Sequence, residues 1–198
     1  ADVASFLAQR RLFIVETSNF GDPVTGLFFM RTVFAPSEPG FTSTGFKAEF
    51  APVAAKWNME WQLRDARVKP NVLILVSRQD HCLNDLLYRY RIGALPIEIP
   101  AIVSNHPDFY QLAAANGIPF HCVPVTSANK LKQEEQLLEI VREERCDLVV
   151  LARYMQILSP GLCAQLKERA INIHHSFLPS FQGAKPYQQA HDRGVKLI

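Results

Sequence analysis

The first third of the chain mixes two hydrophobic periods. The pattern predicts helices over residues 2–10 and 45–56, and strands rich in β-branched and aromatic side chains over 12–19 and 26–34. The segment between these strands reads FGDPVTG, in which Gly and Asp-Pro favour a tight hairpin turn. A third strand is predicted over residues 58–67. The order α-β-β-α-β is that of a ferredoxin-like unit without its first strand.

From residue 69 onward, short apolar runs alternate with amphipathic segments. The runs are near-continuous, as in strands covered on both faces. Alternating strands and helices predict a doubly wound parallel sheet. We therefore expect an α/β protein of two domains, residues 1–68 and 69–198, with a linker at 68–71. Strands are predicted at 71–77, 99–104, 120–125, 147–154 and 170–176, and helices at 82–91, 108–116, 130–144 and 159–167.

Composition excludes several classes of partner. The 198 residues are 48% hydrophobic and 20% charged, with a formal net charge of +2, so neither nucleic acid nor an anionic membrane is indicated. No apolar run is long enough to span a bilayer. The four cysteines are widely spread, without metal-ligand spacing. We expect reduced, mostly buried thiols in a cytoplasmic protein, rather than zinc ligands or disulfides.

Ligands of doubly wound sheets bind beyond the carboxyl ends of strands, near the switch point. After the first of these strands, SRQDHC (residues 77–82) contains no glycine, and no glycine-rich phosphate loop occurs elsewhere. A nucleotide or phosphorylated substrate is therefore disfavoured. Asp80 is expected to cap the next helix, while His81 could face the cleft.

The connection after the fourth strand is unusually apolar. Residues 153–158 read RYMQIL where polar residues usually lie. Such a segment suits a flat, partly apolar ligand. Ser159 and Pro160 are expected to begin the following helix, as its cap and its first residue.

The last strand end reads NIHHSFLP and begins at Asn172. Side chains alternate along a strand, so Asn172 and His174 are expected on one face, and His175 on the other. An amide beside an imidazole suits carbonyl chemistry, because the amide can stabilise an oxyanion while the histidine moves protons. A buried structural histidine beside a capping asparagine explains the pattern equally well. A metal site is disfavoured, because neighbouring histidines on opposite faces cannot chelate one ion.

Together these segments resemble a known family. NIHHSFLPSFQG, preceded by LARYMQILSP, is similar to the formyltransferase superfamily that uses 10-formyltetrahydrofolate. The similarity is greatest to its formyltetrahydrofolate deformylases, on SRQDHCLNDLLYR, on NHPDF and on TGLFFMRTVF, which resembles their N-terminal ACT regulatory domain. The resemblance covers essentially the whole chain. It implies a Rossmann-like domain at 69–198 that hydrolyses 10-formyltetrahydrofolate to formate and tetrahydrofolate, supplying formate for purine synthesis without a metal or redox cofactor.

The resemblance also implies roles for individual residues. Asn172 would hydrogen-bond the formyl oxygen and its developing oxyanion, and His174 would act as general acid and base. The role of His175 is left open. Gln182 and Gly183 would close over the site. The pteridine pocket would be lined by Arg153, Tyr154, Met155, Gln156, Ile157 and Leu158.

Two parts of the family pattern are missing. An aspartate that orients the histidine and the attacking water is expected beyond Ile198, so this stretch alone should be inactive. The ACT-like region lacks its first strand and the loop that usually helps to bind an amino-acid effector. The chain begins without Met and ends as a strand begins, so we expect it to be clipped at both ends. An amino-acid effector and a homo-oligomer are further expectations from the resemblance.

Two other functions remain open on the sequence. A formyltransferase would pass the group to an amine such as methionyl-tRNA or an amino sugar, although the near-neutral charge argues against tRNA. A regulatory protein that binds folate or an amino acid would keep the fold without the reaction. Formate release without an acceptor distinguishes hydrolysis from transfer. A continuation of the reading frame that encodes the aspartate distinguishes the enzyme from the binding protein.

Overall fold

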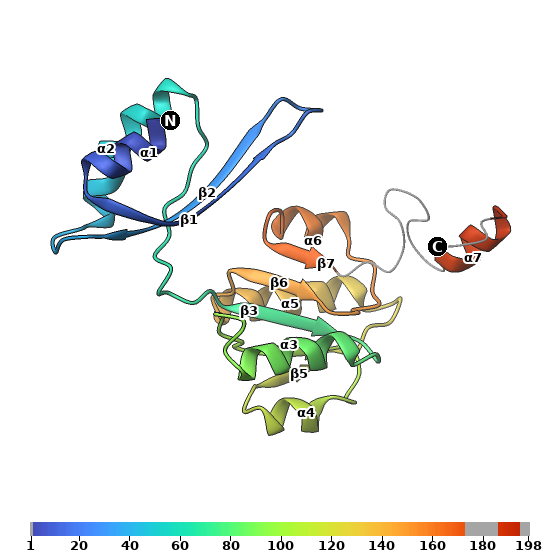
Figure 1. Cartoon of the computed structure of the whole chain (residues 1–198). Coiled ribbons are helices and arrows are strands. Elements are labelled where there is room, and N and C mark those ends of the chain that lie inside the picture. The colour runs from blue at the N-terminus through green and yellow to red at the C-terminus, as the bar shows by residue number, and fades with distance from the viewer. Residues whose placement is uncertain (1, 173–185, 195–198) are drawn as a thin grey trace. The chain divides into compact units, whose positions relative to one another are not determined.

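The structure is a computed structural model that describes residues 2–172 and 186–194. The chain divides into two compact units, Ala1–Val68 and Lys69–Ile198, and each is described by itself (Figure 1). Among the described residues, no helix is long and apolar enough to cross a bilayer.

The N-terminal unit packs two helices against a β-hairpin. Its elements are α1 (Asp2–Gln9), β1 (Leu12–Gly21), β2 (Phe28–Pro36) and α2 (Ser43–Lys56). The strands pair antiparallel, with a register shift between Ile14 and Glu16. Aromatic rings fill the core, where Phe46 lies edge-on to Phe6 at 5.4 Å and stacks on Phe50 at 5.6 Å between ring centroids. The turn chemistry and the two helical patterns were therefore interpreted correctly.

The strand predicted over residues 58–67 does not form within the described chain. Met59, Trp61 and Leu63 pack against the core in alternation, which explains why the pattern resembled a strand. The sheet of this unit nevertheless contains β1 and β2 alone among the described residues. A strand needs a neighbour for its backbone N–H and C=O groups, and the segment has none here. The described unit is thus α-β-β-α, and the predicted fifth element was wrong.

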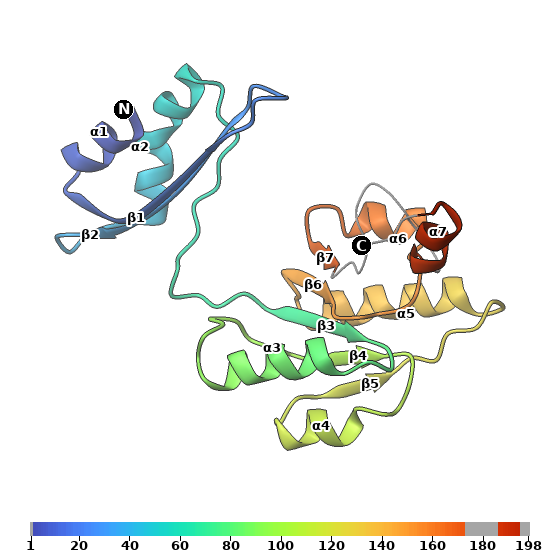
Figure 2. The same ribbon diagram turned by 45° about the vertical axis from the view of Figure 1, so that its right-hand side comes forward.

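The C-terminal unit is a parallel five-stranded sheet in the order β5-β4-β3-β6-β7. The chain runs from central β3 outward to β5, then crosses back to β6 and continues to β7, so the order reverses between β3 and β6 (Figure 2). The doubly wound α/β prediction is confirmed. The strands are β3 (Val72–Val76), β4 (Ile102–Ser104), β5 (Phe120–Cys122), β6 (Leu148–Leu151) and β7 (Ala170–Asn172), and the helices are α3 (His81–Arg91), α4 (Tyr110–Ala115), α5 (Lys130–Glu143), α6 (Pro160–Gln165) and α7 (Pro186–Asp192).

Alternate side chains of β3 contribute to two separate cores. Leu73 and Leu75 pack with residues of α5 and α6 on one face of the sheet. Val72, Ile74 and Val76 pack with residues of α3 and α4 on the other face. All five side chains of β3 are buried, as the continuous apolar run predicted. This rigid central strand ends where the candidate site begins.

Several predicted features differ in detail. The strands predicted at 99–104 and 147–154 are shorter in the structure, where β4 and β6 span 102–104 and 148–151, because only those residues pair with β3. The described residues of β7 are exposed rather than covered on both faces, since β7 is an edge strand of the described sheet. The expectation of mostly buried thiols was also wrong. Cys146 is buried, but Cys122 and Cys163 are exposed, and all four thiols are free.

Candidate functional site

Three strand ends from distant parts of the sequence meet at one edge of the sheet. Strand β6 lies between β3 and β7, and Leu151 on β6 is paired with Asn172 on β7. The strand order reverses between β3 and β6, which makes this edge the topological switch point where ligands of such sheets bind. The segment after β3, the segment 152–159 after β6 and Asn172 form the candidate site.

Ser77, the residue after β3, connects two of these segments. Its backbone N–H donates to the Arg153 carbonyl at 3.2 Å. Its Oγ accepts the Met155 N–H at 2.8 Å and donates to Asn105 Oδ1 at 2.7 Å. The residue that ends the central strand therefore holds the start of the apolar connection.

The network continues along the end of β4. The Asn105 amide nitrogen lies 3.1 Å from His106 Nε2, and the His106 N–H donates to Ser104 Oγ at 3.1 Å. Ser77, Ser104 and Asn105 are all buried. Buried polar groups are costly unless they are paired, and the side chains of these three residues all have partners.

Arg153 adopts an unusual backbone conformation at the start of the connection. Its φ angle is +61°, in the left-handed region that side chains disfavour. Its guanidinium Nε donates to Gln79 Oε1 at 2.6 Å. The backbone turn and this side-chain bond both bring the chain from the end of β6 across the end of β3.

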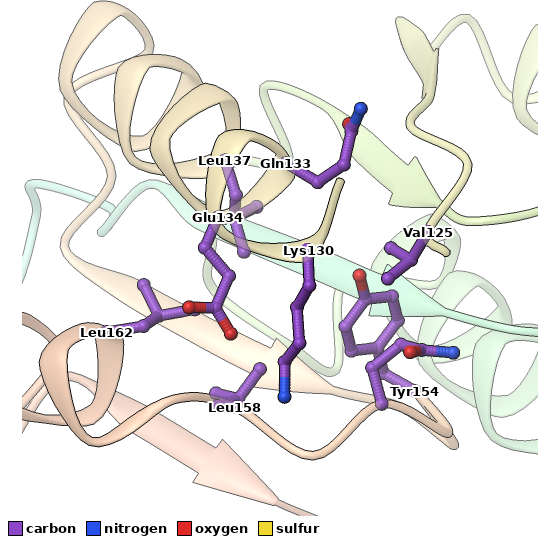
Figure 3. A pocket seen from close by; sticks show the side chains of 9 residues that line it. Val125, Lys130, Gln133, Glu134, Leu137, Tyr154, Leu158 and Leu162 are labelled. Carbon is purple, nitrogen blue, oxygen red and sulfur yellow. The ribbon is translucent and has the colours of Figure 1, made fainter. Parts of the chain in front are cut away.

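Beyond Arg153, the side chains of the connection point alternately in two directions. Tyr154, Gln156 and Leu158 line a small recess against α5 (Figure 3). The recess has a volume of about 10 Å³, room for about one water molecule, and cannot hold a pteridine ring. Met155 and Ile157 are instead 53% and 66% exposed. The exposed side chains, rather than the recess, are available to a ligand.

Burial controls the chemistry of Tyr154. It raises the pKa of the phenol to about 12, and the nearby Glu134 carboxylate acts in the same direction. The Glu134 carboxylate also accepts the Ser159 N–H at 2.8 Å. Ser159 in turn caps α6 by accepting the Leu162 N–H at 3.1 Å, with Pro160 at the first turn, as predicted.

The predicted cap at the start of α3 was wrong. Asp80 lies at the N-cap position, but its backbone is helical rather than extended and its side chain makes no capping hydrogen bond. The carboxylate accepts from Asn84 Nδ2 at 2.9 Å. His81 begins α3 and is exposed. Within the described residues, no cluster of His, Cys, Asp and Glu could hold a metal ion.

Asn172 is the last described residue of β7, and it is exposed. The structure therefore places the predicted oxyanion donor beside β6, which separates it from β3 and from Ser77 at the end of β3. His174, His175, Gln182 and Gly183 lie outside the described residues.

Comparison with protein families identifies the C-terminal unit. The model for "Formyl transferase" matches residues 70–198, which is more than half of the chain. The chain belongs to the formyl transferase family. Its sheet, switch point and apolar connection are thus those of a formyl transferase domain, and the predicted fold of residues 69–198 is confirmed.

This formyl transferase family member has close relatives over both units. Formyltetrahydrofolate deformylase of Corynebacterium sp. (strain P-1) is 47% identical over 196 residues, which are 99% of this chain and 68% of that protein. Crystal structures of formyltetrahydrofolate deformylases from Burkholderia mallei and Pseudomonas syringae pv. tomato match with TM-scores of 0.84 and 0.88, at 47% and 42% identity. Each match covers 98% of this chain, and 69% and 65% of the respective crystallised chain.

Sequence reasoning missed the buried network of this formyl transferase domain. The segment NHPDF served only as evidence of the resemblance, and nothing in the sequence singled out His106, His121 or His191. In the structure His106 is half-buried and bonded to Asn105, whereas His191 is exposed. The available signal was the polar pair Ser104 and Asn105, at the end of an otherwise apolar strand.

Proposed function

We propose that the protein hydrolyses 10-formyltetrahydrofolate to formate and tetrahydrofolate. The observation that carries this proposal is the 47% identity to a formyltetrahydrofolate deformylase across 99% of the chain. Deformylases from two further organisms share the fold of 98% of the chain. The reaction would release formate for purine synthesis and restore the free tetrahydrofolate pool.

Asn172 and His174 are the proposed catalytic residues. Water attacks the formyl carbon while a base takes its proton, the bond from carbon to N10 breaks, and N10 is protonated as it leaves. Asn172 donates to the formyl oxygen as negative charge develops on it, and His174 moves the protons. The position of Asn172 at the end of β7, next to β6, supports its assignment. The proposed step uses only protein groups and water, with the folate as substrate.

The segment from Arg153 to Leu158 is the proposed contact surface for the pteridine. Its side-chain alternation refines the assignment. Met155 and Ile157 are exposed and can pack on a flat ring, whereas Tyr154, Gln156 and Leu158 face α5 and support the segment from behind. We assign Gln182 and Gly183 to the loop that closes over the formyl group.

The N-terminal unit is proposed to be an ACT-like regulatory domain. A groove of about 290 Å³ lies along the hairpin and is lined by phenylalanines together with Arg31 and Glu60. Arg31 is paired with Glu16 at 3.2 Å, so we assign an amino-acid effector to this unit on its resemblance to ACT domains and not on the charges of the groove. The exposed apolar residues of the hairpin support a homo-oligomer. Four free thiols fit a reducing compartment, and we assign the reaction to the cytoplasm.

Formate release from 10-formyltetrahydrofolate, with no amine acceptor present, tests the proposed reaction in the full-length protein. Asn172→Ala should lower kcat by about 10²–10³, because one oxyanion donor is lost, and His174→Ala should have an effect of at least similar size. Tyr88→Phe, on the exposed surface of α3, is the control and should leave the rate unchanged. If the wild-type protein released formate only when an amine acceptor was added, transfer would replace hydrolysis as the function.

A further inference from the structure

The buried polar residues of the described chain gather at one place. Ser77, Ser104 and Asn105 follow or end the adjacent strands β3 and β4, and they are 3%, 0% and 7% exposed. Polar groups of the described residues are otherwise concentrated at the surface, as desolvation requires. A polar cluster inside a switch-point edge thus needs an explanation, and its hydrogen bonds suggest one.

Ser77 fixes the apolar connection at two points. It donates its N–H to the Arg153 carbonyl, and its Oγ accepts the Met155 N–H. These two bonds lie on either side of Tyr154, whose ring packs against the core beneath α5. The chain at residues 153–155 is therefore held by two hydrogen bonds and one buried ring.

Asn105 orients the hydroxyl that makes the second bond. A serine hydroxyl can rotate, but its proton is directed to Asn105 Oδ1 at 2.7 Å. With its proton so placed, Ser77 Oγ presents a lone pair to the Met155 N–H. Asn105 is itself held by its contact with His106.

The conformation held in this way is one that the chain would otherwise avoid. Arg153 has a φ of +61°, and such conformations persist only where the surrounding structure determines them. At the other end, the Ser159 N–H is bound by Glu134, and Ser159 caps α6. The exposed Met155 and Ile157 lie between two fixed ends.

We propose that Ser77, oriented by Asn105, is a positioning residue that sets the conformation of residues 153–158 and thereby the affinity for the folate. The inference rests on the proposed function, which assigns that segment to the pteridine. The Ser77 hydroxyl donates to Asn105 and accepts from Met155, so we expect it to act through the segment on substrate binding, which is shared by the ground state and the transition state.

Kinetics of Ser77→Ala in the full-length protein test this role. The variant should raise KM for 10-formyltetrahydrofolate by about fivefold to thirtyfold, the effect of one or two lost hydrogen bonds, with kcat within about twofold of wild type. The dissociation constant of tetrahydrofolate, measured by calorimetry, should rise by the same factor. This second readout does not depend on hydrolysis.

Two further variants separate positioning from stability. Asn71→Ala removes a side chain that donates to the Glu144 carbonyl at 3.2 Å, at the opposite end of β3 from Ser77 and outside the network that orients it. It should lower the melting temperature and leave KM and the dissociation constant unchanged. Ser77→Thr keeps the hydroxyl and should bind folate within about threefold of wild type. If Ser77→Ala does not fold, Asn105→Ala takes its place, with an expected rise of about twofold to tenfold in both constants.

Each outcome is decisive. Unchanged KM and dissociation constant in Ser77→Ala, or an equal rise in Asn71→Ala, would overturn the positioning role. If Asn105→Ala has to serve as the test and leaves both constants unchanged, the role is overturned as well. A wild-type protein that bound tetrahydrofolate but released no formate would contradict the hydrolysis, and the dissociation constants would still decide the role of Ser77. A wild-type protein that did not bind tetrahydrofolate would overturn both.

Discussion

Tyr154 shows how a single buried side chain supports an exposed binding segment. Its ring packs with the core beneath α5, while the neighbouring Met155 remains exposed. Burial keeps the phenol neutral and raises its pKa from 10.0 to about 12. Below about pH 10, the folded and unfolded chains both retain the proton. Between about 10 and 12 the unfolded chain alone releases it, so the free energy of unfolding falls as the pH rises.

Tyr154→Phe should remove this contribution to the pH dependence. The variant keeps the ring and lacks the proton, so between about pH 8 and about pH 11 it should lose less stability than wild type, by on the order of 1–2 kcal/mol. Urea unfolding at the two pH values measures the difference. Tyr110→Phe, which removes an exposed hydroxyl, is the matched control. Equal losses in wild type and Tyr154→Phe would contradict the burial of the phenol.

At the scale of elements, four of the described helices end in the same hydrogen-bond pattern with different residues. After α2, α3, α4 and α5, the left-handed position is occupied by Asn58, Gly93, Gly117 and Arg145, with φ angles of 49°, 75°, 68° and 49°. In α5, the Arg145 N–H donates to the Arg142 carbonyl and the Cys146 N–H to the Val141 carbonyl, which is the Schellman motif. Glycine adopts this conformation without steric cost, asparagine tolerates it, and arginine is disfavoured.

Arg145→Gly should therefore stabilise the protein by up to about 1 kcal/mol. Its side chain is exposed, so the substitution removes little packing. The midpoint of urea unfolding measures the gain. Arg145→Ala removes the same charge but keeps a Cβ, and it should not reproduce the stabilisation. An equal gain in both variants would assign the effect to charge rather than to the backbone.

The elements predicted correctly from the sequence are those in which packing fixes the spacing of the apolar residues. The run Val72–Val76 is apolar because both of its faces are covered, and that cover is what the prediction inferred. The segment 58–67 failed because Met59, Trp61 and Leu63 alternate against the core while the backbone has no neighbouring strand among the described residues. The spacing of apolar side chains indicates which residues are buried, but it does not show whether a neighbouring strand is present to pair with the backbone.

The candidate site divides in the same way. Asn172 was predicted from alternation along a strand, which is a local signal, and the apolar connection was predicted from its composition; the structure places both segments at the switch-point edge. Ser77, by contrast, is hydrogen-bonded to Asn105, which lies 28 positions away in the sequence, and to Met155, which lies 78 positions away. Only the order of strands in the sheet brings those residues together, and one sequence carries no local signal of it.

At the scale of the whole molecule, the N-terminal hairpin carries an uncovered apolar surface. Phe20, Phe28 and Phe29 are 61%, 65% and 53% exposed, and each strand of the hairpin has an unpaired edge within the described residues. Large exposed apolar surfaces and free strand edges both favour association with another chain. This is the surface to which we assign the homo-oligomer.

Phe29→Glu should shift the full-length protein toward smaller species. A carboxylate placed in an apolar interface loses its hydration, so the interface is weakened by several kcal/mol. Sedimentation velocity at matched concentrations measures the change. Tyr88→Glu, at an exposed aromatic residue of α3 in the other unit, is the control and should sediment as wild type. A wild-type protein that sediments as a monomer would contradict the assignment of this surface.

The reversal of strand order between β3 and β6 has a consequence for synthesis of the chain. Strand β3 emerges from the ribosome first among the strands of its sheet, yet Val72 must wait for Leu148 before its second edge is paired. At about 5–20 residues per second, that wait lasts several seconds. During that interval the most apolar strand of the unit presents an open edge to other nascent chains. The topology that creates the binding edge thus also leaves this strand open to misassembly while the rest of the unit is being synthesised.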